Sequence, residues 1–154
     1  MTLPEIHKTS RIILATPRAI FRILLDPETI PAWRSSKGMT ARVEHFDPRP
    51  SGTYCFAFNY PENDRGCGTS SPHPDIINGH FIEILPDERI MEAIRFETGD
   101  PRYQATMTVT TTLESVRDGT KVTLTAQDVP PGISEADHRA RMDWTLKMLA
   151  NFIE

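Results

Sequence analysis

The amino-acid sequence predicts an α+β protein in which a curved antiparallel sheet wraps a long amphipathic C-terminal helix and encloses a cavity with it. Three observations support this fold class. Two short helical patterns follow a first strand, six strand-like segments then succeed one another, and an apolar stripe with helical spacing ends the chain. Because no strand–helix–strand repeat is present, we expect the strands to pair antiparallel. A chain of 154 residues can bury its own core, so residues 1–154 are expected to form one domain.

The first strand and the two short helices are expected near the N-terminus. Residues 5–15 include an apolar, largely β-branched run that is typical of a strand. Thr16 and Pro17 then mark a helix start, since threonine caps a helix and proline suits its first turn. Apolar residues recur at helical spacing over residues 18–25, and a second short helix is expected to carry Trp33.

Six further strands are predicted from alternating residues and from the prolines between them. The chain has 13 prolines, and proline neither donates to a strand ladder nor fits inside a helix. The predicted strands cover residues 39–46, 53–60, 76–85, 89–97, 103–113 and 121–127. The fifth alternates most regularly, with threonines expected on a solvated face. Its expected inner residues are Ala105, Met107, Val109, Thr111 and Leu113.

Aromatic residues gather on one face of the predicted strand over residues 53–60. They are Tyr54, Phe56, Phe58 and Tyr60. With Trp33 they are expected to form either the wall of a small-molecule pocket or ordinary core packing against the last helix. In this fold the two uses involve the same surface.

The last helix is expected to begin near Ser134, which with Asp137 resembles a capping box. A helix of about 20 residues spans roughly 30 Å, enough to cross the sheet. Its apolar stripe comprises Met142, Leu146, Leu149, Phe152 and Ile153. His138, Arg139 and Arg141 are expected to form a solvated face near the start of the helix.

Composition excludes several classes of partner. The net charge is −4 and no Lys/Arg run exceeds two residues, which argues against nucleic acid. No apolar run approaches a membrane span and no signal peptide is apparent, so a cytoplasmic protein, monomeric or homodimeric, is expected. Cys55 and Cys67 are too few for a disulfide framework, and their pairing stays open. Cys67, His73 and Asp75 match no zinc spacing, so we expect neither a metal nor a cofactor.

The chain resembles the START-like, or SRPBCC, superfamily, in the branch related to the C-terminal domain of activators of the heat-shock-protein-90 ATPase. The resemblance covers about residues 6–154 and depends on the order and spacing of short fragments. They are Ala15-Thr16-Pro17, Asp26-Pro27-Glu28 with Trp33, Asp47-Pro48-Arg49-Pro50-Ser51-Gly52, Gly79-His80-Phe81-Ile82-Glu83-Ile84, Pro86-Asp87-Glu88-Arg89-Ile90, Thr112-Leu113-Glu114, Gly119-Thr120-Lys121-Val122 and Phe152-Ile153-Glu154.

The resemblance implies a helix-grip fold. Such a fold has a seven-stranded antiparallel sheet, two short helices after the first strand, and a C-terminal helix gripped by the sheet. In many members it also implies an internal cavity for an apolar small molecule. The chain departs from the family pattern where Ser51-Gly52 replaces paired glycines, where Arg34 follows Trp33, and where Glu92 and Ile94 replace bulky apolar or aromatic residues.

Glu92 and His80 are the candidate catalytic residues. Glu92 is the only polar member of an otherwise apolar face of residues 89–97, so it could place a proton donor or acceptor in the cavity. The alternatives are a bulged strand, or a position near the cavity mouth where Glu92 pairs with an arginine. His80, on the neighbouring strand, is expected to form an acid–base pair with Glu92 or to be an ordinary half-buried histidine.

Three functions follow from these observations. The first is binding of a small, largely apolar molecule between sheet and helix. Its expected contact residues are Trp33, Tyr54, Phe56, Phe58, Phe81, Glu92, Ile94, Met107, Met142, Leu146 and Leu149. The second is a polyketide cyclase or aromatase in which Glu92 acts with His80 or a tyrosine. The third, implied by the resemblance alone, is a module that stimulates a chaperone ATPase.

Overall fold

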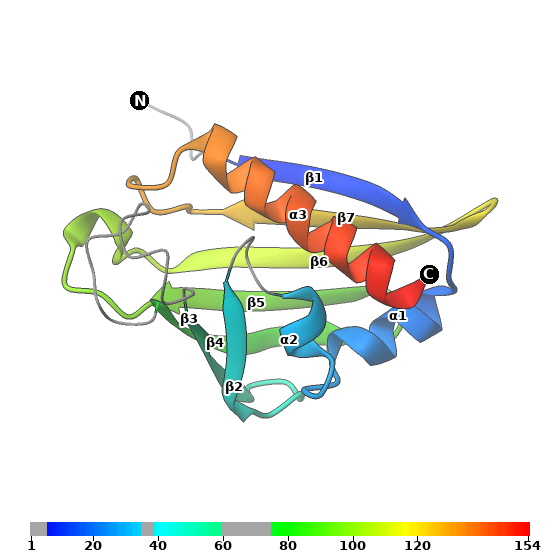
Figure 1. Ribbon diagram of the computed structural model, residues 1–154, viewed down its shortest axis with the longest axis horizontal. Coiled ribbons are helices and arrows are strands. Elements are labelled where there is room, and N and C mark those ends of the chain that lie inside the picture. The colour runs from blue at the N-terminus through cyan, green and yellow to red at the C-terminus, as the bar shows by residue number, and fades with distance from the viewer. Residues whose placement is uncertain (1–5, 35–38, 60–74) are drawn as a thin grey trace.

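In the part of the chain that the structure describes, seven strands form one antiparallel sheet in the order β1-β7-β6-β5-β4-β3-β2 (Figure 1). The computed structural model of the protein describes residues 6–34, 39–59 and 75–154. The strands are β1 (Ile6–Ile13), β2 (Thr40–Phe46), β3 (Thr53–Asn59), β4 (Asp75–Leu85), β5 (Arg89–Phe96), β6 (Met107–Val116) and β7 (Gly119–Gln127). Because β1 pairs with β7, the first and last strands of the chain are neighbours.

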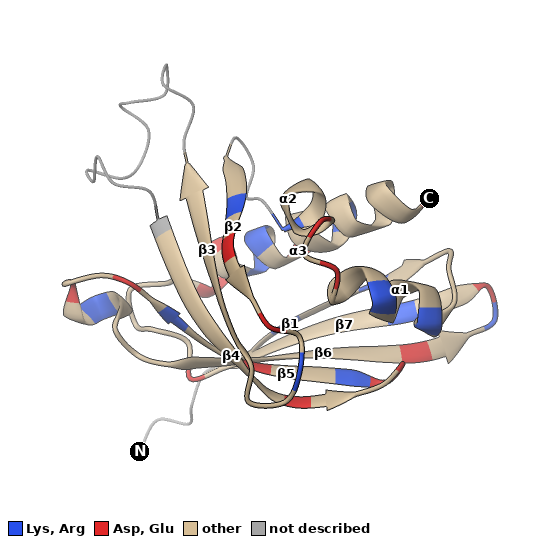
Figure 2. Ribbon diagram, turned by 90° about the horizontal axis from the view of Figure 1, so that it is seen from below, with Lys and Arg blue, Asp and Glu red and all other residues tan. Residues whose placement is uncertain are grey.

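Among the described residues, three α-helices lie on the concave side of the sheet. They are α1 (Pro17–Leu24), α2 (Ile30–Trp33) and α3 (Glu135–Ile153). Figure 1 shows α3 crossing the sheet, and the helix packs against β1 and α2. Figure 2 shows the curvature, since β2 and β3 rise away from the plane of β5, β6 and β7 around the helices. The predicted α+β helix-grip architecture is therefore confirmed.

The predicted caps begin both longer helices. The hydroxyl of Thr16 accepts a hydrogen bond from the Ala19 N–H at 3.1 Å, and Pro17 occupies the first turn of α1. The hydroxyl of Ser134 accepts one from the Asp137 N–H at 3.2 Å at the start of α3. These bonds satisfy N–H groups that have no partner within the helix.

Two predicted positions at element ends are wrong. Strand β6 begins at Met107 because the residues before it form a 3-10 turn over Pro101–Tyr103, in which the Asp100 side chain accepts the Arg102 N–H at 3.0 Å. Ala105 is therefore exposed rather than inward. Phe152, expected in the apolar stripe of α3, is 45% exposed because it lies on the last turn of the helix.

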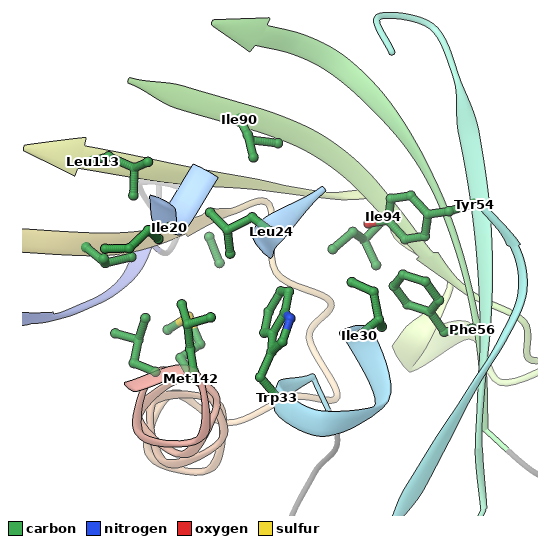
Figure 3. Packing of buried hydrophobic residues seen from close by; sticks show 14 of the residues in the cluster. Ile20, Leu24, Ile30, Trp33, Tyr54, Phe56, Ile90, Ile94, Leu113 and Met142 are labelled. Carbon is green, nitrogen blue, oxygen red and sulfur yellow. The ribbon is translucent and has the colours of Figure 1, made fainter. Parts of the chain in front are cut away.

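The core lies between the sheet and the helices. Figure 3 shows Met142 of α3 and Trp33 of α2 pointing toward the sheet, with Leu24 of α1 beside them. Along β6 the predicted alternation is confirmed at Met107 and Leu113, which are buried. Within the described ranges, no helix has the length and apolarity needed to cross a lipid bilayer.

Candidate functional site

A cavity of about 180 Å³ separates the inner face of the sheet from α3. Its walls come from all three helices and from strands β3 to β7. Most of the lining is apolar and buried, contributed by Leu24, Trp33, Phe58, Phe81, Ile90, Ile94, Met107, Val122, Met142, Leu146 and Leu149. Lining residues at the start of α3 and the end of β5 are half-buried or exposed, so the cavity opens there. These are Ile133, Arg141 and Phe96.

One polar cluster interrupts this apolar wall and joins three separate segments of the chain. Glu92 points inward from β5 and is 4% exposed. Tyr54 of β3 donates its hydroxyl proton to Glu92 Oε1 at 2.6 Å. Arg34, which caps α2, places Nη1 and Nη2 each 3.3 Å from the same oxygen and Nη2 3.2 Å from Tyr54 Oη. We call Arg34, Tyr54 and Glu92 the polar cluster.

Three aromatic rings also lie close to the guanidinium of Arg34. Its central carbon lies 5.0 Å from the ring centre of Phe56, 5.3 Å from that of Tyr54 and 5.9 Å from that of Trp33. Tyr54 and Phe56 stack on each other with ring centres 4.6 Å apart. Because ring faces attract cations, these rings and the carboxylate together fix the position of Arg34.

The polar cluster contains one positive charge, on Arg34, and one negative charge, on Glu92. Burial opposes the charged form of Arg34, but the Glu92 carboxylate and then Tyr54 raise the pKa of Arg34 above its ordinary value. Burial, reinforced by the Glu92 charge, raises the pKa of Tyr54 well above the ordinary value. The guanidinium therefore stays charged and the phenol keeps its proton, so the cluster as a whole is neutral.

The predicted pairing of Glu92 with His80 is wrong. His80 is exposed on the outer face of β4, where it lies opposite Ala93, while Phe81 lies inward opposite Glu92. Successive side chains of a strand point to opposite faces of the sheet, so His80 must point outward when Phe81 points inward. The partner of Glu92 is instead Arg34, so the alternative of an arginine pair is the one that the structure supports.

Most of the predicted contact residues line the cavity. Those that do are Trp33, Phe58, Phe81, Glu92, Ile94, Met107, Met142, Leu146 and Leu149. Tyr54 and Phe56 are buried but do not line it, and their rings lie against the guanidinium of Arg34, which does. Five polar lining residues were not among the predicted contacts, namely Arg34, Thr111, His138, Arg141 and Thr145. For Arg34 a signal was present, since it departs from the family pattern beside Trp33.

His138 was expected on a solvated face, and this expectation is wrong. The residue is buried and lines the cavity near the start of α3. Because α3 packs against β1, the imidazole faces the sheet, and its Nδ1 lies 2.8 Å from Nδ1 of the fully buried His7. Such a bond needs one nitrogen as donor and the other as acceptor. Nearby, Thr9 donates its hydroxyl proton to Asp143 Oδ1.

Several other predicted features lie outside the described residues, among them Tyr60, Cys67 and His73. Cys55 is half-buried and its thiol is free, and burial raises its pKa. Over residues 6–34, 39–59 and 75–154, no three His, Cys, Asp or Glu side chains are grouped as they would be around a metal ion.

The buried His138 gives a prediction for pH dependence. Burial first, then His7 and Arg141, lowers the pKa of His138 from 6.5 to about 4. The unfolded chain therefore binds this proton near pH 6.5 and the folded protein only near pH 4, so the free energy of unfolding falls as the pH drops between these values. We expect wild type to lose about 2 kcal/mol more than His138→Asn between pH 7 and pH 4.5, measured by urea unfolding.

The matched control is His80→Asn, which removes an exposed histidine from the outer face. It should keep the pH dependence of wild type. If the free energy of unfolding changes equally with pH in wild type and His138→Asn, the pKa of His138 is the same in the folded and unfolded states.

The gripped helix, the curved seven-stranded sheet and the cavity between them define a protein of the START-like, or SRPBCC, superfamily. The chain belongs to the family described as activator of Hsp90 ATPase homolog 1-like protein, whose model matches residues 14–154. The family resemblance of the sequence is thereby confirmed. No curated protein matches the chain.

Solved structures share this fold. Protein CV1439 from Chromobacterium violaceum superimposes with a TM-score of 0.83 at 24% identity, covering 97% of this chain and 96% of that one. Protein Mll3558 from Rhizobium loti gives 0.73 at 26% identity, covering 97% and 96%. DynU16, a putative protein in the dynemicin biosynthetic locus, gives 0.68 at 14% identity, covering 96% of this chain and 46% of that one.

Proposed function

We propose that this protein binds a small, largely apolar molecule in the cavity between the sheet and α3. The observation that carries the proposal is a largely apolar cavity of about 180 Å³ with the Arg34–Glu92 pair of the polar cluster on its wall. Apolar walls with a few convergent polar groups are the usual composition of small-molecule sites. Methionines suit such a site because their side chains adapt to varied shapes, and Met39, Met107 and Met142 line it.

The volume limits the size of the ligand. An apolar cavity of about 150 Å³ accommodates benzene, whereas pockets for drug-sized molecules measure roughly 300–1,000 Å³. A cavity of about 180 Å³ therefore fits a molecule of about one or two rings. A larger molecule would have to extend through the open end beside Arg141.

Filling the cavity should weaken binding. Val109 lines the cavity from β6, and a phenylalanine there would occupy the space of a ligand. We expect 4-ethylphenol, 5-indanol or 2-naphthol to bind wild type. Val109→Phe should raise the dissociation constant by about tenfold or more. Ligand-observed NMR or isothermal titration calorimetry measures this difference.

The matched control adds the same ring on the other face of the same strand, as Thr110→Phe. This variant should bind like wild type. If none of the three compounds binds wild type, or if Val109→Phe binds them equally well, the cavity is not the binding site.

An enzyme of the polyketide-cyclase type is the second candidate. It is favoured by the presence of Glu92 and Tyr54 in one cluster, 2.6 Å apart, beside the cavity. In that case Glu92 would move a proton on the bound molecule, and conversion of a ligand would be lost in Glu92→Gln. The small volume argues for the binding role, because a multi-ring polyketide exceeds the space available.

A further inference from the structure

The two carboxylate oxygens of Glu92 have different surroundings. Every hydrogen bond within the polar cluster that reaches Glu92 ends on Oε1, from Tyr54 at 2.6 Å and from both terminal nitrogens of Arg34 at 3.3 Å. Among the described residues, none donates to Oε2. Yet Glu92 is 4% exposed and lines the cavity. Oε2 is not among the enclosed side-chain atoms of the described residues that lack a hydrogen-bond partner, and Glu92 lines the cavity, so Oε2 can accept a hydrogen bond from a molecule inside the cavity.

We propose that Oε2 of Glu92 is the acceptor that anchors the ligand, and that the ligand is a small, neutral aromatic or alicyclic molecule bearing a hydroxyl group. This inference rests on the proposed binding function and names its ligand class. In the empty site a water molecule can donate to Oε2. A ligand hydroxyl replaces that bond, whereas a ligand without a donor displaces the water and leaves the oxygen unpaired.

The charges of the polar cluster disfavour a charged ligand group at Oε2 of Glu92. A ligand carboxylate would meet the Glu92 carboxylate at hydrogen-bond distance, and like charges repel strongly in an apolar site. A ligand ammonium would lose its hydration, while Arg34 already neutralises the charge of Glu92 at 3.3 Å. A neutral hydroxyl is not repelled by Glu92 as a carboxylate would be, and it does not lose the hydration of a charge as an ammonium would.

The test compares hydroxyl compounds with their methyl ethers, which accept but do not donate a hydrogen bond. The pairs are 4-ethylphenol with 4-ethylanisole, 5-indanol with 5-methoxyindane, and 2-naphthol with 2-methoxynaphthalene. For each frame that binds, we expect wild type to prefer the hydroxyl compound by about fivefold or more in dissociation constant, because a hydrogen bond to a charged group is stronger than a neutral one.

Glu92→Gln should reverse this preference. Arg34 and Tyr54 both donate toward the position of Oε1, so they require the amide oxygen there. The amide NH₂ is then turned toward the cavity, where it donates instead of accepting. The ether should therefore bind Glu92→Gln at least as tightly as the hydroxyl compound. Glu83→Gln makes the same chemical change at a half-buried glutamate that pairs with Arg89, outside the cavity, and should keep the preference of wild type.

The outcomes separate the two proposals. If hydroxyl compounds and ethers bind wild type equally, the cavity binds apolar molecules but Oε2 is not the anchor. Retention of the hydroxyl preference in Glu92→Gln would overturn the inference as well. If no member of any pair binds, the proposed function fails and the inference fails with it. The wild-type comparison decides the matter even if Glu92→Gln does not fold.

Discussion

Arg34→Met is expected to lower the free energy of unfolding by about 3 kcal/mol. Removing the guanidinium leaves the Glu92 carboxylate buried, and the Tyr54 hydroxyl is then its one partner among the described residues. A lone buried charge is far more costly than a buried pair, and the side chain of Arg34 is itself only 18% exposed. Urea unfolding monitored by tryptophan fluorescence measures the change.

A second variant separates charge from packing. In Arg34→Met with Glu92→Gln no charge is left in the cluster, and the amide oxygen of the glutamine still accepts from Tyr54. The double variant should recover all but about 1 kcal/mol of the wild-type stability. A loss below 1 kcal/mol in Arg34→Met alone would mean that water reaches Glu92 and compensates its charge.

Gly79→Ala is expected to destabilise the fold by about 3 kcal/mol and to disrupt the polar cluster. Gly79 lies opposite Tyr54 across β3 and β4, and the tyrosine ring lies over it. A methyl group at Gly79 would meet Tyr54 Oη at 2.5 Å and Cε1 at 2.6 Å, as well as Cζ. Because the ring is enclosed by Phe46, Phe56 and Phe81, it cannot move without breaking its bond to Glu92.

Gly99→Ala is the matched control, since nothing lies within 4 Å of the added methyl group. Its midpoint in urea should stay within error of wild type. Gly79→Ala combined with Tyr54→Val should be more stable than Gly79→Ala alone, because the smaller side chain vacates the contested space. Equal urea midpoints for Gly79→Ala and wild type would refute the account of Gly79.

Much of the architecture was predictable because it depends on local patterns. Proline positions separate the strands, alternation assigns the faces of β6, and the caps at Thr16 and Ser134 mark the helix starts. These signals lie within a few residues of the feature they predict. Alternation placed Glu92 on the face of β5 that carries Ile90, Ile94 and Phe96, but the direction in which that face points stayed open.

The partners within the site were not predictable, because they depend on which distant segments the fold brings together. Arg34, Tyr54 and Glu92 are separated by 20 to 58 positions in the chain, and no local pattern relates them. The burial of His138 likewise depends on the crossing of α3 over β1. Which residues of β4 face the cavity was left open by its sequence. A shift of one residue exchanges the two faces, and the observed register places His80 outside.

The pairing of β1 with β7 bears on how the protein reaches its folded state. His7 lies opposite Ala126, so two strands from opposite ends of the chain must meet before the sheet is complete. Contacts so distant in sequence slow folding, because a long loop must close before they stabilise anything. A growing chain on the ribosome cannot make them until β7 has emerged. A ligand that binds only the completed cavity would then stabilise the last state formed and draw the folding equilibrium toward it.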